Sequence, residues 1–196
     1  GQGSNTIMTQ IAADALGLPV GQFTLVSGDT DLTADAGKTS ASRQTFVSGK
    51  AAERAGLDLR QKILRLANAG PDAALTLDGA SLKVSDGGVT HVLDLAKVGP
   101  LMGEGTFDPP TTALDENGQG IPYATYAFAA QIAIVEVDIE LGTVKVLRMV
   151  AAHDVGKAIN PLGVKQQIEG GVIMGIGQAL TETLMRDKAT GVPLNP

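Results

Sequence analysis

Residues 153–180 read HDVGKAINPLGVKQQIEGGVIMGIGQAL, and this stretch decides how the second half of the chain folds. We expect Asn160 to cap a helix whose first turn contains Pro161, where a missing backbone N–H costs nothing. The amides at this helix start, together with Lys157, favour an anion. The helix carries glycine at four positions from 170 to 177, and each lowers helix stability unless another group approaches closely. The stretch therefore predicts a helix against which a ligand or another backbone packs.

The flanking sequence predicts an α+β fold, a mixed β-sheet with helices packed on it. Residues 123–139 and 144–152 have the pattern of long strands, and the first is largely apolar on both faces, as in an internal strand. Shorter strands are expected at 23–27, 75–77, 82–84 and 89–93. Helices are expected at 4–16, at 40–68 with Gly56 as a potential break, at 94–98 and at 161–185. Residues 103–122 are the least regular, which predicts a functional or interface-forming segment.

Composition restricts the classes of function. The 196 residues suffice for one large domain or two small halves, and the net charge of −6 argues against non-specific nucleic-acid binding. The absence of cysteine excludes disulfides and thiolate-bound iron–sulfur clusters in this chain. His91 and His153 lie far apart in sequence and do not have the spacing of metal ligands. No apolar run approaches the roughly 18 residues of a membrane span and no signal peptide is visible, so we expect a cytoplasmic chain. Both ends fall within motif-like sequence, so we expect a piece of a longer polypeptide.

Three predicted helix starts share one chemical character. They are residues 1–4 (GQGS), 37–45 (GKTSASRQT) and 156–161 (GKAINP). Each combines glycine and short polar groups with backbone N–H groups that no helix carbonyl accepts. Ordinary capping explains any one of them alone. Three such starts around one point would bind a ligand that has several phosphate or carbonyl oxygens.

Conventional catalytic sets have weaker support. Ser42, His153 and Asp154 have the residue types of a hydrolase triad, but no nucleophile elbow surrounds any serine. A turn at the end of a strand explains His153 and Asp154 more simply. Glu169, in the glycine-rich helix, is a candidate acid–base group or else the partner of a nearby base or backbone amide.

Several motifs together resemble one family, the molybdopterin-binding subunit of xanthine dehydrogenases and aldehyde oxidases. They are, in order, GQGSNTIMTQIAADALGLP (1–19), VSGDTD (26–31), ASRQTFVSG (41–49), GTFDPPTT (105–112) and the stretch 153–180. The resemblance covers most of the chain except about residues 70–100, and it is to the second of the family's two molybdenum-binding regions. It implies a single molybdopterin-binding region over 1–196, or two lobes of about 1–100 and 101–196.

The resemblance also implies an activity, cofactors and partners. The activity is that of a molybdenum hydroxylase, which oxidises an N-heteroaromatic (purine- or nicotinate-like) or aldehyde substrate with water as the oxygen source. The cofactor in this chain is molybdopterin, in a mononucleotide or dinucleotide form, and electrons pass to a 2Fe-2S cluster and FAD held elsewhere. The implied partners are the rest of the molybdenum-binding subunit and the iron–sulfur and FAD subunits or domains, in a hetero-oligomer or a dimer.

Residue by residue, the resemblance implies a cofactor-binding set and no catalytic or metal-ligating residue in the chain. The set is Gln2, Gly3, Ser40, Ala41, Ser42, Gln44, Thr45, Lys157 and Gln167. The family's catalytic glutamate follows a glycine pair beyond an Asn-Pro segment like that of Asn195 and Pro196. We therefore expect this base to lie beyond Pro196 and the 196 residues alone to be inactive. Two alternatives remain open, a structural or assembly domain without cofactor and a subunit that folds only beside its partner.

Overall fold

The structure, a computed structural model, describes residues 2–37, 39–40 and 42–195. They divide into two compact units, Gly3–Thr125 and the residues from Tyr126 onward together with Gln2. The elements of the first unit are α1 (Ser4–Leu16), the 3-10 helix η1 (Val20–Gln22), α2 (Gln44–Leu66), β1 (Ala74–Asp78), β2 (Ser81–Asp86), β3 (Val89–Asp94) and α3 (Leu95–Val98). Those of the second unit are β4 (Phe128–Asp138), β5 (Thr143–Asp154) and α4 (Pro161–Leu180).

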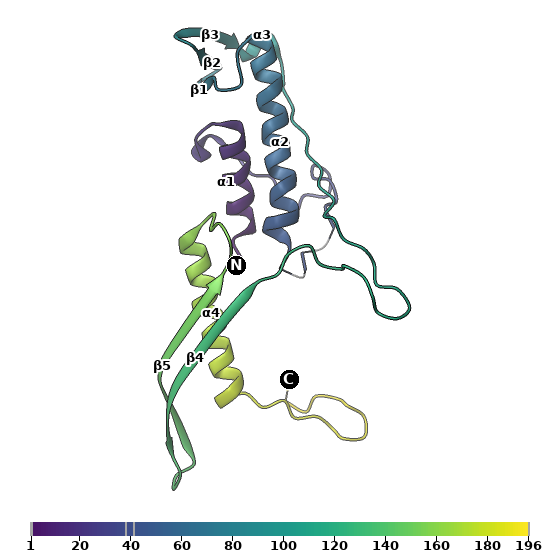
Figure 1. The fold of residues 1–196 in the computed structure, drawn as a ribbon, viewed down its shortest axis with the longest axis vertical. Helices are drawn as coiled ribbons and strands as arrows, with labels where there is room; N and C mark the ends of the chain where they lie inside the picture. Colours follow the sequence, from purple (N-terminus) through teal and green to yellow (C-terminus); the bar gives the residue numbers. More distant parts are fainter. Residues whose placement is uncertain (1, 38, 41, 196) are drawn as a thin grey trace. The chain divides into compact units, whose positions relative to one another are not determined.

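Helices α1 and α2 lie side by side and run in the same direction (Figure 1). Gly49, near the start of α2, faces the side chains of Met8 and Ile11, and Gly56 faces the last turns of α1. Further along α2, the Arg60 guanidinium donates a hydrogen bond to the last carbonyl of α1, with an N–O distance of 3.0 Å. Because the contacts advance together along both helices, the two helices begin at the same end of the unit.

The other end of the helix pair packs on a three-stranded antiparallel sheet of order β1-β2-β3. Hairpin turns at Gly79 and at Gly87-Gly88, all with positive φ, join the strands. The buried cluster combines the ends of both helices with one face of the sheet and comprises Leu16, Ile63, Leu64, Ala67, Ala73, Leu75, Leu82 and Val84. Among the residues that the structure describes, all the buried hydrophobic side chains lie in this first unit.

Two details of the first unit differ from the sequence-based expectations. Residues 23–27 are not a strand, because Phe23 is extended but pairs with no neighbouring strand and instead packs its ring against the buried cluster. The second helix begins at Gln44 rather than at residue 40, because Ser42 has a φ of 52°, which a right-handed helix does not accommodate. The helix then continues through Gly56 without a break.

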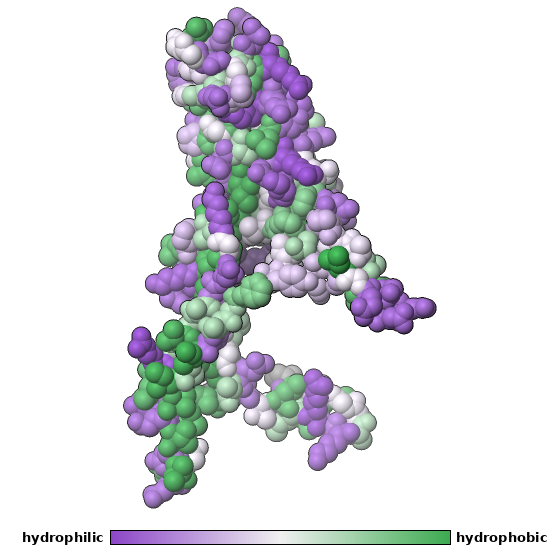
Figure 2. Space-filling view, in the orientation of Figure 1, coloured by the Kyte–Doolittle hydropathy of each residue, from purple (hydrophilic) through white to green (hydrophobic). Residues whose placement is uncertain are grey.

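In the second unit, β4 and β5 form an antiparallel ribbon, with an irregularity in register between Ile134 and Val135. Asn160 caps α4 as predicted, but the helix ends at Leu180 rather than at 185. The apolar side chains of the ribbon are exposed, and Figure 2 shows them as a largely hydrophobic surface over β4 and β5. The apolar strand expected to be internal is thus paired with β5 alone among the described residues.

The α+β class is confirmed. The described strands form two antiparallel sheets, of three and two strands, rather than one mixed sheet. In the described part of the chain, no helix combines the length and the apolar character that crossing a membrane requires.

Candidate functional site

Two helix starts in the first unit have the character of an anion site. The N-cap of α1 is Gly3, with a φ of 81°, and the N-cap of α2 is Arg43. Among the described residues, neither N-cap residue caps its helix with a side-chain hydrogen bond, and neither first turn contains an acidic residue. Most helices satisfy their first amides with a capping oxygen or place a carboxylate there. The two starts therefore present backbone amides and positive dipole ends without a negative charge of their own.

These two starts lie at the same end because α1 and α2 run parallel. Gly56 makes the close approach possible, because a Cβ there would lie 2.8 Å from the carbonyl oxygen of Ala12 and 2.8 Å from the Cβ of Ala15. The dipoles of the two helices consequently point the same way and reinforce each other at their N-termini. The sequence predicted three starts around one point, and the first unit brings together the two that belong to it.

The VSGDTD motif is held beside the start of α1. The Asn5 amide nitrogen, in the first turn, donates a hydrogen bond to the Ser27 hydroxyl at 3.2 Å. The Asp29 carboxylate accepts hydrogen bonds from the backbone amides of Asp31 and Leu32 at 2.9 and 3.2 Å. The loop thus places the Ser27 hydroxyl beside the helix start, while the Asp29 carboxylate is engaged in hydrogen bonds within its own turn.

The serine-rich loop leads into α2 in an unusual conformation. Ser42 is one of two described non-glycine residues with positive φ, a conformation that is uncommon outside glycine and concentrates at functional sites. Ser40 is half-buried and Thr45 is exposed. The Gln44 amide oxygen accepts a hydrogen bond from the Ser48 hydroxyl at 3.3 Å, which holds this side chain along the helix. Ala41, also in the predicted set, lies outside the described residues.

The third helix start belongs to the second unit. The Asp154 carboxylate accepts a hydrogen bond from the Gly156 amide at 2.9 Å, and Gly156 has a φ of 62°, which turns the chain out of β5. The Asn160 side chain accepts from the Gly163 amide at 3.0 Å and so caps α4. Lys157 is exposed within this turn. Gln167 lies on an exposed position of α4, one helical turn or more beyond the cap.

The rival catalytic sets are not supported by the geometry. His153 and Asp154 are successive residues of β5, so their side chains point to opposite faces of the ribbon. The His153 Nε2 lies 3.4 Å from the amide nitrogen of Gln131. Glu169 is exposed and lies 3.7 Å from the ammonium of Lys165, one turn earlier, which agrees with pairing to a nearby base. Within the described ranges, no cluster of three or more His, Cys, Asp or Glu side chains could hold a metal ion.

The Asn-Pro segment that marks the expected position of the catalytic base is described only in part. Asn195 accepts a hydrogen bond from the Met185 amide at 2.8 Å and donates one to the carbonyl oxygen of Thr183. Pro196, beyond which the family resemblance places the catalytic glutamate, lies outside the described residues. The location of that glutamate therefore stays a prediction from the resemblance.

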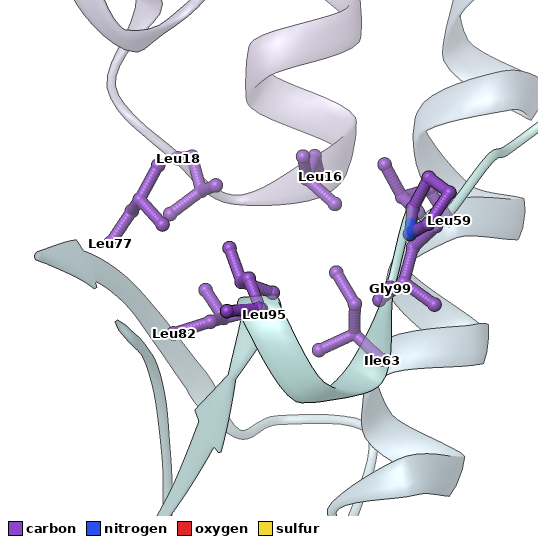
Figure 3. Close-up of a pocket in the computed structure, with 11 residues that line it drawn as sticks. Leu16, Leu18, Leu59, Ile63, Leu77, Leu82, Leu95 and Gly99 are labelled. Atoms are coloured by element: carbon purple, nitrogen blue, oxygen red, sulfur yellow. The ribbon is translucent and has the colours of Figure 1, made fainter. Parts of the chain in front are cut away.

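The first unit also contains an apolar cavity of about 530 Å³, which the sequence did not predict. Leucine side chains from the helix ends, the sheet and α3 converge on it, as Figure 3 shows for Leu16, Leu59, Leu82 and Leu95. It lies at the end of α1 and α2 opposite to their starts, since Leu16 is the last residue of α1. No charged side chain lines it, so it offers none of the groups needed for phosphate binding or acid–base chemistry.

Comparison with known proteins shows the family of the chain. The family model for the molybdopterin cofactor-binding domain matches residues 1–196. The chain belongs to this family. The domain is 32% identical over 205 residues to the xanthine dehydrogenase molybdenum-binding subunit of Escherichia coli O157:H7, an alignment that covers all of this chain and 26% of the relative. It is 31% identical over 200 residues to the 6-hydroxypseudooxynicotine dehydrogenase complex subunit gamma of Paenarthrobacter nicotinovorans, covering 96% of this chain and 24% of the relative.

Among solved structures, quinoline 2-oxidoreductase from Pseudomonas putida 86 superposes with a TM-score of 0.69 at 26% identity and covers 100% of the domain and 26% of that chain. The domain therefore spans about a quarter of the length of these relatives. The family resemblance of the sequence motifs is confirmed.

The donors in the molybdopterin cofactor-binding domain fit such a cofactor. The cofactor carries phosphate, and both helix-start amides and a lysine such as Lys157 bind phosphate well. Its pterin has amide-like edges with both donors and acceptors. Glutamine side chains and backbone groups have complementary donors and acceptors, so they can form hydrogen bonds with these edges. The first turns of α1, α2 and α4 contain no acidic residue that would repel the phosphate.

Proposed function

We propose that this domain binds and orients the molybdopterin of a molybdenum hydroxylase. The observation that carries the proposal is the pair of parallel helices, α1 and α2, which begin at the same end of the first unit. In the described part of the chain, neither has a side-chain hydrogen bond from its N-cap residue or an acidic residue in its first turn. Such starts are ready-made sites for phosphate. The family match supports the choice of molybdopterin over other phosphate-bearing ligands.

The proposed binding residues divide by chemistry. Backbone amides at the starts of α1 and α2, near Gln2, Gly3, Gln44 and Thr45, donate to oxygens of the cofactor. The hydroxyls of Ser40 and Ser42 add donors, and the small side chain of Ala41 lets the ligand approach. Lys157 supplies a positive charge, and Gln167 supplies an amide that can both donate and accept.

When bound, the molybdenum of the cofactor supplies the redox centre for oxidation of the substrate, and the domain's own residues supply binding and orientation. We propose an N-heteroaromatic substrate that takes its oxygen from water, because 6-hydroxypseudooxynicotine and quinoline, named for two relatives, contain such rings. Aldehydes are the competing substrate class. We further propose that a 2Fe-2S cluster and FAD in partner domains or subunits take up the electrons, since this chain has no cysteine to bind a cluster.

The test is the cofactor content of the complete enzyme that carries this domain. Molybdenum is measured by metal analysis, and the released pterin by its fluorescence after oxidation. Gln167→Ala and Lys157→Ala should lower the content roughly tenfold, the effect of losing one charge-assisted contact. Two residues of matched type provide the controls. Gln166 and Lys165 are exposed on α4, as Gln167 is, whereas Lys157 is exposed in the turn that precedes this helix. Gln166→Ala and Lys165→Ala should retain the wild-type content.

Four results would count against the proposal or one of its parts. A wild-type enzyme without molybdenum or pterin would favour the structural or assembly domain instead. Equal losses in the variants and in their controls would show a general effect on α4. Full loading of both Gln167→Ala and Lys157→Ala would remove these residues from the binding set. Turnover of aldehydes but not of N-heteroaromatic compounds by the loaded enzyme would overturn the proposed substrate class.

A further inference from the structure

Residues 102–107, which we call the strap, lie extended along helix α2. The exposure of this segment alternates, with Gly103, Gly105 and Phe107 half-buried and the residues between them exposed. An alternation with period two is typical of an extended segment that rests one side on a surface. The strap thus belongs to the irregular segment of the sequence but has a definite structure of its own.

Two glycines let the strap backbone touch α2. A Cβ at Gly103 would overlap the carbonyl oxygen of Ala55, and a Cβ at Gly105 would overlap that of Ala51. The later strap residue thus lies against the earlier helix residue, so the strap runs antiparallel to α2 and advances toward its start. Any side chain at these two positions would push the segment off the helix.

The beginning of the strap is fixed by a polar clip. The Lys62 ammonium donates to the carbonyl oxygen of Met102 at 2.9 Å and to the Asp58 carboxylate at 2.7 Å. The same carboxylate accepts a hydrogen bond from the Glu104 amide at 3.0 Å. The bond from Lys62 and the bond from Glu104 together hold the pKa of Asp58 below its usual value of 3.8.

The end of the strap is fixed by an aromatic clamp. The Arg54 guanidinium donates to the carbonyl oxygen of Thr106 at 2.6 Å and lies 4.9 Å from the centre of the Phe107 ring. The Phe107 ring meets the ring of Phe46 edge to face, with 5.3 Å between centroids and 85° between planes. The contact between Arg54 and the Phe107 ring is a favourable cation–π interaction, and the contact between the two phenylalanine rings is a favourable T-shaped one.

Phe46 lies in the first turn of α2, directly after Gln44 and Thr45. We propose that Phe107, held by Arg54 and packed against Phe46, is a positioning residue that fixes the first turn of α2 for cofactor binding. This inference rests on the function proposed above. Its physical basis is that binding amides must be held to a fraction of an ångström, and the side chains that surround them supply this rigidity.

The variants Phe107→Leu and Phe107→Tyr test the proposal in the complete, cofactor-loaded enzyme. Leucine keeps most of the apolar volume and removes the ring, whereas tyrosine keeps the ring. The readout is the rate at which pterin fluorescence appears in solution at a urea concentration well below unfolding. Phe107→Leu should release the cofactor about tenfold faster, which corresponds to ~1.4 kcal/mol, and Phe107→Tyr should release it at the wild-type rate.

Phe23→Leu is the matched control for an effect on stability alone. Phe23 is also a half-buried phenylalanine of the first unit, and it packs against the buried cluster at the opposite end of the helices. Equal acceleration by Phe23→Leu, or a wild-type release rate in Phe107→Leu, would overturn the positioning role while the proposed function stands. A wild-type enzyme that carries no pterin would overturn both.

Discussion

Gly56 packs closely against the backbone of α1, and its replacement by alanine should destabilise the first unit. Alanine in a helix interior is favoured over glycine by about 1 kcal/mol. Against this, the new Cβ would lie 2.8 Å from the carbonyl oxygen of Ala12 and 2.8 Å from the Cβ of Ala15, neither of which can rotate away. Overpacking of this kind costs about 1–3 kcal/mol. We therefore expect a net loss of about 1 kcal/mol in the free energy of unfolding.

Gly49→Ala is a matched control in the same helix. Its new Cβ would lie 2.9 Å from the Cδ1 of Ile11, the end of a flexible side chain that can change rotamer. The gain in helix propensity should then prevail and raise stability by up to about 1 kcal/mol. The two variants should thus differ by about 2 kcal/mol, or roughly 1 M in the urea midpoint for an m-value near 2 kcal/mol/M.

The assay is urea unfolding followed by circular dichroism at constant pH, with the m-value compared between variants. The packing argument is tested by the opposite signs expected for the two changes in the free energy of unfolding. Both glycine-to-alanine substitutions have the same effect on the unfolded chain, so this effect cancels in the comparison. If Gly56→Ala stabilises the protein as much as Gly49→Ala does, the helices are not in the close contact described, and the alignment of their N-termini loses its support.

Two further predictions concern the clip and the cap. Because the pKa of Asp58 is lowered below 3.8, its contribution to stability is present above that value and is lost as the pH falls through the lower folded-state pKa. Hydrogen exchange of the Glu104 amide, which donates to Asp58, should therefore be slowed at neutral pH and lose its protection as the pH falls below the folded-state pKa of Asp58, which is lower than 3.8. Unchanged protection after Asp58 is protonated would contradict the clip. Asn160→Ala should lower stability by about 1 kcal/mol, whereas Asn160→Asp, which can still accept from the Gly163 amide, should be near wild type in thermal unfolding. Equal melting temperatures for both variants would show that this cap contributes nothing.

Much of the local structure could be predicted because its causes are local. Asn160 and Pro161 specify the start of α4, and glycine turns specify the hairpins of the small sheet. The boundaries that were wrong had causes elsewhere in the structure. Phe23 is extended, but its ring is recruited to the buried cluster and no strand lies beside it to pair. The start of α2 is delayed by the left-handed Ser42, a conformation that no propensity for serine would indicate.

The sequence predicted which residues belong to the candidate site, but it did not predict how they are arranged in space. The sequence motifs supplied the binding set through the family resemblance, and the chemistry of the helix starts supported it. The ordered structure of the strap was not predicted from the sequence, because residues 103–122 have no hydrophobic periodicity that indicates a helix or a strand. One signal was available, since Gly103 and Gly105 are spaced by two, as expected where one side of an extended chain touches a helix.

The sequence by itself determined the cofactor-binding family, the α+β class and the starts of α1 and α4, because motifs, caps and turns act over a few residues. Only the tertiary structure decided that α1 and α2 run parallel, so that their uncapped starts share one end. It also decided which glycines serve packing, such as Gly56, and which merely turn the chain, such as Gly79. The physical reason is that close approach depends on what lies across from a residue, and that partner is set by long-range packing of aliphatic side chains rather than by sequence neighbours.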